Sequence, residues 1–222
     1  MSKSFDINIC SDFGVKEASE SLLSFLKHCC LGPDKDEVLL GSLFLGYYLE
    51  LPHNRAGFCS ERTDFVLLVI SQLKSVKSNQ IQYQFLFSVW LLTFDAKNCS
   101  ALLQVPDLVP NLIEVAKLAV KEKVVRLVVS CFINLLKNSK ILAIPQFVGA
   151  KVASFVETLL NRTYSDQEFL DDISNLSKEL NFEIQNLSDS DDTKHLKEAL
   201  EKYTSTNLID VGHAGTDMRF LT

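Results

Sequence analysis

The side chains of this sequence that could do chemistry are its histidines, its cysteines and one pair of adjacent aspartates. His28 precedes Cys29 and Cys30, which are types that bind transition metals, yet the four histidines lie far apart and pair with no recognisable nucleophile. Asp171 and Asp172 could suggest paired carboxylates for acid–base chemistry. Neighbouring residues on a helix point about 100° apart, so these two do not converge. We interpret them as a solvated acidic face.

Motifs that hold phosphates, nucleophiles or metals are also missing from the sequence. It contains no phosphate-binding loop, no G-x-G-x-x-G, no G-x-S-x-G and no H-E-x-x-H, and we interpret the GHAG string at Gly212–Gly215 as a chance match. The six cysteines are scattered without a C-x-x-C pair, which predicts buried free thiols rather than disulfides or a zinc site. We therefore predict a protein that is not an enzyme by itself and that uses no cofactor and no metal.

Composition restricts the partners and the compartment. Apolar residues make up 47% of the chain and charged residues 23%, which is typical of a folded globular protein. The net charge of −6 disfavours sequence-independent binding to nucleic acid or to an anionic membrane. The sequence opens with no signal peptide and has no apolar run of about 18–20 residues, the length that spans a bilayer. We expect a soluble, intracellular protein without direct membrane insertion.

The stretch VKEKVVRLVVSCFINLL, residues 120–136, is apolar on nearly every side. At about 100° per residue its apolar side chains cover most of the helix, while the polar ones fall within one narrow arc. Such a helix is packed on about three sides, as an inner helix of a helical solenoid is; a helix at the centre of one globular core is the alternative. The polar strip is a candidate partner-binding surface, with a merely solvated strip as the alternative, and comprises Lys123, Arg126, Ser130, Asn134 and Lys137.

The same pattern recurs along the chain. Ser88 lies 42 residues before Ser130, and Gly46 lies 42 residues before Ser88. Three inner helices are therefore expected side by side, near 38–51, 80–94 and 122–136. A period of about 40–47 residues is that of HEAT and armadillo repeats, and no stretch alternates as a strand does. We predict an all-α fold, an armadillo/HEAT-like helical-repeat superhelix or α-solenoid.

Other helices are predicted around these three. One covers Ser11–Pro33, and outer helices begin near Thr63, Val105 and Ile144, where Pro106 and Pro145 suit first turns. A terminal helix over 166–187 would be capped by Ser165 or Asp166. We assign 1–187 to one helical-repeat domain and 188–222 to an acidic linker, a short helix and a disordered tail. The terminal helix has one apolar stripe, made of Phe169, Ile173, Leu176, Leu180, Ile184 and Leu187.

Several aromatic side chains are predicted to belong to the core. Phe132 and Trp90 lie opposite the polar strip of their helices, so we expect both to be buried. Tyr47 and Tyr48 are also interpreted as core rather than as a stacking platform. Asn134 has two interpretations: its amide could bind the backbone of a partner, or it could hydrogen-bond a neighbouring loop, which we favour.

Three strings, in this order, resemble the N-terminal domain of the H subunit of the vacuolar-type proton-pumping ATPase. They are IQYQFLFSVWLLTF, VPNLIEVAKLAVKEKVVRLVVSCFINLL and RTYSDQEFLDDISNLSKEL. The most specific parts are WLLTF, VKEKVVR and YSDQEFLDDI. The resemblance covers about 80–187, whereas residues 1–79 have only the repeat pattern.

The resemblance implies a non-catalytic subunit on the cytosolic, ATP-hydrolysing sector of the pump. It implies an armadillo/HEAT-like superhelix that docks on the peripheral stalk, built from the E and G subunits, and supports ATP-driven proton transport. The protein would then lie on the cytosolic face of vacuolar or endosomal membranes through the complex. Family members are longer, and a second helical domain in them silences the detached motor. In this sequence SDSDDTKHLKEALEKY follows Leu187 instead, so the silencing role is not carried over.

Another armadillo-type adaptor, binding a peptide or a helical partner, is the alternative function. Nuclear-import receptors, for example, use a ladder of Trp and Asn along their inner helices. The equivalent positions here are Glu50, Leu92 and Asn134, which form no such ladder. The sequence therefore favours the pump subunit.

Overall fold

The computed structural model describes residues 12–76 and 78–188, and every regular element in those ranges is a helix. The all-α prediction is therefore confirmed. The chain divides into two compact units, Met1–Gln146 and Phe147–Thr222, and each is described by itself. The linker, short helix and tail predicted for 189–222 lie outside the described residues.

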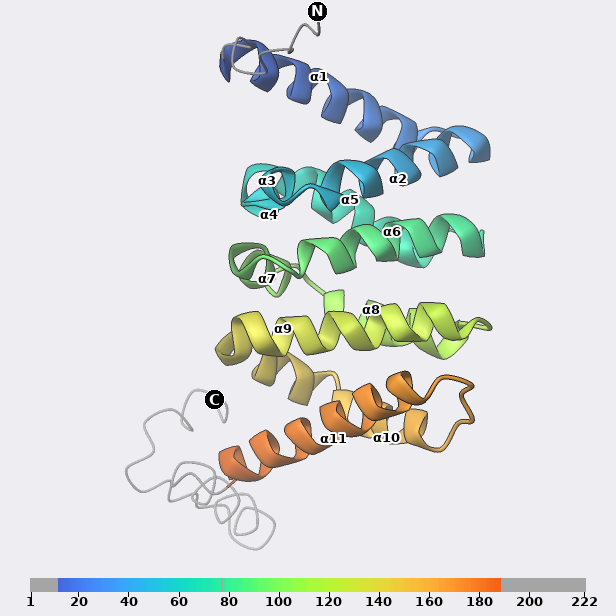
Figure 1. Cartoon of the computed structure of the whole chain (residues 1–222), viewed down its shortest axis with the longest axis vertical. Helices are drawn as coiled ribbons and strands as arrows, with labels where there is room; N and C mark the ends of the chain where they lie inside the picture. The colour runs from blue at the N-terminus through green and yellow to red at the C-terminus, as the bar shows by residue number, and fades with distance from the viewer. Residues whose placement is uncertain (1–11, 77, 189–222) are drawn as a thin grey trace, which may run out of the picture. The chain divides into compact units, whose positions relative to one another are not determined.

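The first unit is built from long, short and medium helices that follow one another in a repeating order (Figure 1). The short helices were not predicted from the sequence. Two of them have only four residues each, and so short a helix shows no periodic pattern of apolar residues. The elements are α1 (Asp12–Leu31), α2 (Lys35–Glu50), α3 (Pro52–Arg55), α4 (Phe58–Glu61), α5 (Thr63–Ser75), α6 (Asn79–Leu92), α7 (Ala96–Leu102), α8 (Leu108–Leu118) and α9 (Glu122–Gly149), whose last residues cross into the second unit.

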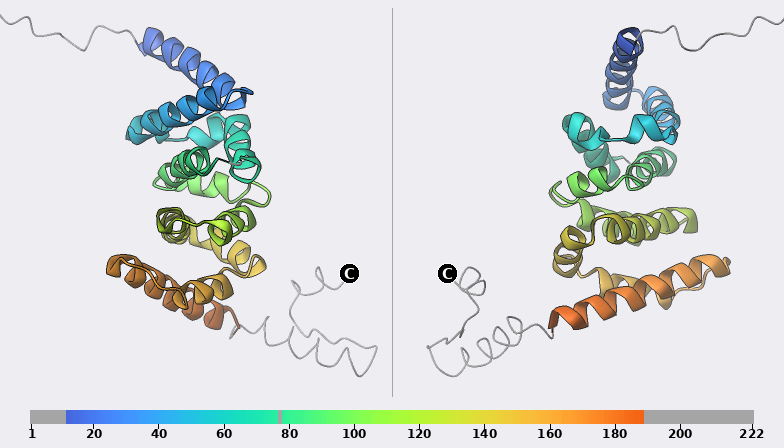
Figure 2. Two further views of the ribbon diagram at one scale, coloured as in Figure 1. Left: turned by 90° about the vertical axis from the view of Figure 1, so that its right-hand side faces the viewer. Right: turned by 60° about the vertical axis from the view of Figure 1, so that its left-hand side comes forward.

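The three long helices α2, α6 and α9 lie side by side, as their shared pattern predicted (Figures 1 and 2). They begin within three residues of the predicted positions, and a side-chain cap fixes the start of two of them. The side chain of Asp34 accepts a hydrogen bond from the amide of Asp36 at the start of α2, and Ser78 caps α6 in the same manner. The medium helices α5 and α8 pack on each other behind this row.

Helix α9 contains a break at Ser139, where φ is −151° and ψ is 51°. The residues before the break form the predicted inner helix, and those after it form a short helix that contains Pro145. The prediction that Pro145 starts an outer helix was wrong, because the turn occurs at Ser139 instead. The hydroxyl of Ser139 lies 3.1 Å from that of Ser100 on α7, which anchors the turn.

By length and composition alone, α9 is also apolar enough to cross a membrane, and half of its most apolar window is buried. The sequence had been expected to contain no such stretch. Val128, Val129 and Phe132 are each 0% exposed inside the first unit. These side chains are used in packing, so we interpret α9 as a core helix.

Small residues form the seams between neighbouring long helices. Ser42 and Ser88 are both 0% exposed, so the polar arc predicted on α6 is wrong at Ser88. Their hydroxyls donate to carbonyls of their own helices, Ser42 to Leu39 and Ser88 to Gln84. A satisfied small side chain can be buried at little cost and lets the next helix approach closely.

Gly41 marks the closest approach of α1 to α2, and we expect Gly41→Ala to destabilise the protein. A Cβ there would lie 2.7 Å from Cys29 Cβ and 3.2 Å from the backbone nitrogen of Cys30. Overpacking of this kind typically costs about 1–3 kcal/mol, more than the roughly 1 kcal/mol that alanine gains over glycine in a helix. The measurement is the midpoint of urea unfolding.

The matched control is Gly46→Ala on the same helix. Its Cβ would meet only the ring of Phe87, at 3.3 Å, and that half-buried side chain can shift. The helix preference of alanine then offsets the contact, and stability should change little. Equal losses in the two variants would contradict the close packing of α1 on α2.

The second unit contains α10 (Val152–Leu160) and α11 (Gln167–Ser188). The predicted terminal helix is thus confirmed to within one residue at each end. Asp166 supplies the predicted cap, since its carboxylate accepts a hydrogen bond from the amide of Phe169 at 3.3 Å. Phe169, Ile173, Leu176 and Leu180 of the predicted stripe are buried, while the side chains of Ile184 and Leu187 lie outside those described. The predicted domain limit at residue 187 remains a prediction.

Candidate interaction surface

The outward-facing side chains of α2, α6 and α9 recur at one helical phase. On α2 and α6 these positions are apolar, whereas on α9 they are mostly polar or basic. The contrast divides the exposed face of the row into an apolar part and a basic border. The matched positions lie 43 residues apart, one more than the predicted 42. Those on α2 are Leu40, Phe44, Tyr47 and the flanking Leu51, those on α6 are Tyr83, Phe87, Trp90 and the flanking Phe94, and those on α9 are Arg126, Ser130, Ile133 and Lys137.

The apolar part forms a continuous ridge on two helices. On α2 the exposed fractions are 52% for Leu40, 49% for Phe44 and 60% for Tyr47. Surfaces of monomeric proteins rarely carry such a contiguous cluster of large apolar side chains unless it binds something. We call this surface the aromatic ridge and define it as Leu40, Phe44, Tyr47, Tyr83, Phe87, Trp90 and Phe94.

The prediction that Trp90 and Tyr47 belong to the core was wrong. Trp90 is only half-buried and Tyr47 is exposed. The core-facing positions of α6 are filled instead by residues such as Phe85, Leu86 and Val89, all at most 1% exposed. A sequence with apolar residues on nearly every side of a helix does not reveal which side faces a partner.

The rings of the ridge on α6 contact one another along the helix. Centroid separations are 6.4 Å from Tyr83 to Phe87, 5.5 Å from Phe87 to Trp90 and 4.9 Å from Trp90 to Phe94. A cation lies over each end of this stack. The ammonium of Lys123 is 4.0 Å from the centroid of Tyr83, and the guanidinium of Arg55 is 5.5 Å from that of Phe94.

The predicted partner-binding strip on α9 is only partly available. Lys123 and Lys137 are exposed at its two ends, and Ser130 is half-buried between them. Arg126 forms an ion pair at 3.7 Å with Glu122 one turn earlier. The lysines are therefore the members of the strip that can most easily meet a partner.

Asn134 stabilises the neighbouring helix, as the favoured interpretation predicted. Its side-chain nitrogen donates to Thr93 Oγ1 at 2.9 Å, and Asn138 donates to the Thr93 carbonyl at 2.8 Å. Thr93 is 1% exposed at the end of α6, where carbonyls lack partners within the helix. Leu92 is buried as well, so two of the three positions that import receptors use for a ladder are used in packing, while the third, Glu50, is exposed.

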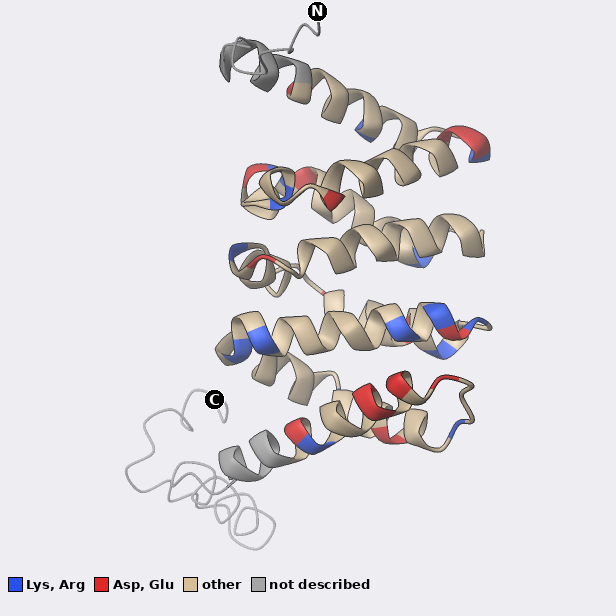
Figure 3. Ribbon diagram, in the orientation of Figure 1, with Lys and Arg blue, Asp and Glu red and all other residues tan. Residues whose placement is uncertain are grey.

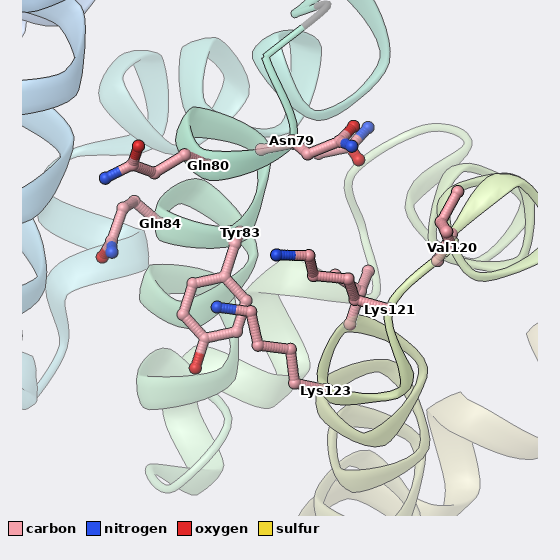
Figure 4. A pocket seen from close by; sticks show the side chains of 10 residues that line it. Asn79, Gln80, Tyr83, Gln84, Val120, Lys121 and Lys123 are labelled. Atoms are coloured by element: carbon pink, nitrogen blue, oxygen red, sulfur yellow. The ribbon is translucent and has the colours of Figure 1, made fainter. Parts of the chain in front are cut away.

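A pocket of about 350 Å³ lies between the first turns of α6 and α9. Tyr83 and the amides of Gln80 and Gln84 line one side, and Lys121 and Lys123 line the other. Figure 4 shows both lysines reaching from the start of α9 toward Tyr83. Two ammonium groups among neutral amides favour an anion, and a carboxylate is the commonest anion that proteins present.

A second hollow of about 190 Å³ lies between α2 and α6. Leu43, Tyr47 and Phe87 line it, together with the polar side chains of Gln84 and Glu50. Tyr83 lines this hollow and also the larger pocket. Gln84 is shared in the same way, so the two hollows meet at these two residues of α6. The smaller hollow is mainly apolar and the larger pocket is basic.

Charge is distributed unevenly over the three helices (Figure 3). The sequence of α6 contains no charged residue, and α2 contains none between Val38 and Leu49. Basic side chains gather instead at both ends of the part of α9 that precedes its break at Ser139. A basic border beside an uncharged ridge is notable in a chain with a net charge of −6.

The histidine, cysteine and aspartate residues that could do chemistry are not brought together in the fold. His28 is exposed, whereas Cys29 and Cys30 are buried; Asp171 accepts a hydrogen bond from Gln167 on the surface. Among the side chains the structure describes, no three His, Cys, Asp or Glu residues gather to hold a metal. Gly212–Gly215 lies outside the described residues.

The cysteines agree with the prediction of buried free thiols at all five described positions. Burial raises the pKa of Cys30 and of Cys59 to about 12, and that of Cys99 to about 11. Thiols held in this state are neutral at physiological pH and are poor nucleophiles. They serve as small apolar side chains in the core; Cys10 lies outside the described residues.

Comparison with known proteins places the chain in a family. A model of the V-ATPase H subunit family matches residues 8–180. The chain is 30% identical over 137 residues to the second probable H subunit of the V-type proton ATPase of Caenorhabditis elegans. It is 26% identical over 175 residues to the V-type proton ATPase H subunit of Drosophila melanogaster and 28% identical over 182 residues to that of Dictyostelium discoideum.

These matches cover 59%, 77% and 81% of this chain but only 28%, 37% and 40% of the respective relatives. The chain thus spans well under half the length of the curated relatives it matches. The family match begins at residue 8 and so extends well upstream of residue 80, where the resemblance first became evident in the sequence. Because it covers most of the chain, this protein belongs to the V-ATPase H subunit family.

Proposed function

We propose that this protein is a non-catalytic subunit of the peripheral sector of the vacuolar proton-pumping ATPase. In this role it binds the stator stalk, built from the E and G subunits, and supports ATP-driven proton transport. It is held on the cytosolic face of vacuolar or endosomal membranes by the other subunits rather than by insertion. The family match over residues 8–180 is the observation that carries this proposal.

The exposed face of the first unit supports a role in binding. A stalk is long, and a row of parallel helices offers a long surface on which contacts can be spread over several repeats. The aromatic ridge and the basic border extend over three successive long helices in this manner. The ridge provides apolar area, and the border provides electrostatic attraction to an acidic partner.

We expect the purified chain to bind a purified E–G stalk, and to bind it more weakly as salt is raised. Lys121, Lys123 and Lys137 supply the charge that salt would screen, because Arg126 is already paired with Glu122. The measurement is the dissociation constant by biolayer interferometry at low and moderate ionic strength. Copurification of the tagged chain with pump subunits from cells is the second readout.

A stalk that fails to bind at low salt, together with no copurification of pump subunits, would overturn the proposed function. Circular dichroism before the binding assay serves as the folding control. If pump subunits copurify while the isolated stalk does not bind, then the chain belongs to the pump but contacts a different component of it.

A further inference from the structure

The aromatic ridge has a specific geometry around Tyr83. The mainly apolar hollow between α2 and α6 and the basic pocket between α6 and α9 meet at this residue and at Gln84. Packed helices have axes about 8–10 Å apart, so the two hollows are separated by about that distance. Two turns of an α-helix rise about 10.8 Å. A single helix laid across α6 can therefore place one side chain in each hollow.

The chemistry of the hollows determines which side chains fit. Leu43, Tyr47 and Phe87 form apolar walls that suit a leucine or a phenylalanine. Lys121 and Lys123, with the amides of Gln80 and Gln84, suit a carboxylate. Glu50 is the one charged residue of α2 and α6 that lines a hollow, so a second buried carboxylate on the bound helix would have no partner there.

We propose that the aromatic ridge binds an amphipathic helix of a partner protein, placing an apolar residue between α2 and α6 and a carboxylate two turns away between α6 and α9. This inference deepens the proposed function and rests on it for the identity of the partner. It does not require the five-residue strip on α9 to act as a whole. Lys121, Tyr47 and Phe87, which the sequence did not single out as binding residues, become part of the site, and Lys123 is retained.

Trp90 makes the proposal measurable without a label. It is the only tryptophan in the chain, and its ring lies 5.5 Å from that of Phe87, which lines the apolar hollow. A helix seated on the ridge covers this half-buried indole and shifts its emission to shorter wavelength. The probe is a designed helical peptide without tryptophan that has leucines along one stripe and glutamates two turns from its central leucine.

Titration of the whole protein with this peptide should give a saturable blue shift of Trp90 emission. The double variant K121E/K123E should weaken binding about tenfold, since each reversal replaces an attraction by a repulsion. Its matched control is K97E/K117E, in which two exposed lysines outside the pocket are reversed, and it should bind as the parent does. A peptide with lysines in place of the glutamates should prefer K121E/K123E over the parent protein.

The apolar hollow is tested by Tyr47→Ser, which should also weaken binding about tenfold. Ile141→Ser is the matched control, because Ile141 is 88% exposed and lines neither hollow. Both positions are exposed, so neither substitution should unfold the protein, and circular dichroism verifies this. The proposal is overturned if the peptide produces no saturable shift, or if each variant binds like its control.

The same four variants are then measured against the purified E–G stalk, which separates this inference from the proposed function. A stalk that binds the parent and all four variants equally overturns the inference and leaves the proposed function standing. If the lysine peptide prefers K121E/K123E over the parent while the stalk binds no form of the protein, the inference is supported and the stalk is not the partner.

Discussion

Phe132→Ala is expected to lower the free energy of unfolding by about 3–5 kcal/mol, the usual cost of removing a large buried aromatic side chain. Phe132 is 0% exposed in the first part of α9, and Val128, Val129 and Leu135 around it are equally buried. A cavity of this size between packed helices cannot collapse without moving the helix row. The measurement is urea unfolding followed by circular dichroism.

The comparison that makes this result informative is Phe94→Ala. Phe94 is 49% exposed at the end of the ridge on α6, so the same chemical change should cost less than about 1.5 kcal/mol. If the two variants lost equal stability, then the assignment of Phe132 to the core and of Phe94 to the surface would be incorrect. The pair therefore tests the helix phase on which the aromatic ridge depends.

The fold could be predicted from the sequence because the same residue pattern recurs in each of the three long helices. Ser42, Gly46 and Ser88 are small residues buried where the long helices pack, and their spacing located those helices. The same residues misled the prediction of exposure. A serine whose hydroxyl bonds its own helix is polar in the sequence and yet packs like a small apolar residue.

The binding surface was harder to predict, and the reason is the composition of the inner helices. A helix that is apolar on nearly every side shows weak periodicity, so Phe85 in the core and Phe87 on the surface look alike in the sequence. The polar strip on α9 was evident, but two of its members are used within the fold. Arg126 pairs with Glu122, and Asn134 bonds Thr93. The first is a local i,i+4 pair within α9, whereas the second depends on non-local packing between helices.

Buried amides illustrate a further limit, and Asn98 is the main example. Its side chain is 0% exposed on α7, accepts a hydrogen bond from the amide of Cys59 at 2.9 Å and donates to the carbonyl of Arg55 at 2.6 Å. Arg55 ends α3 and Cys59 lies in the first turn of α4. One side chain thus satisfies two helix-end groups about 40 residues away in the chain. Nothing local in the sequence distinguishes it from a surface asparagine.

Asn98→Ala is therefore expected to cost about 2–4 kcal/mol of unfolding free energy, because one buried and one partly buried backbone group lose their partner and a buried group left unsatisfied costs about 1–3 kcal/mol. The control is Asn54→Ala, in which the half-buried Asn54 loses one bond, from its amide nitrogen to the Tyr48 carbonyl at 2.9 Å. That variant should lose about 1 kcal/mol.

Hydrogen exchange locates the effect of Asn98→Ala. Loss of the two bonds frees the ends of α3 and α4, so the amides of residues 52–61 should exchange faster, while those of α6, which contains neither bonded group, should keep their protection. Uniform acceleration across α6 and α9 would show that Asn98 supports the whole helix row rather than these two short helices. In that event the junction between successive repeats, and not the core around Phe132, would limit the stability of the first unit.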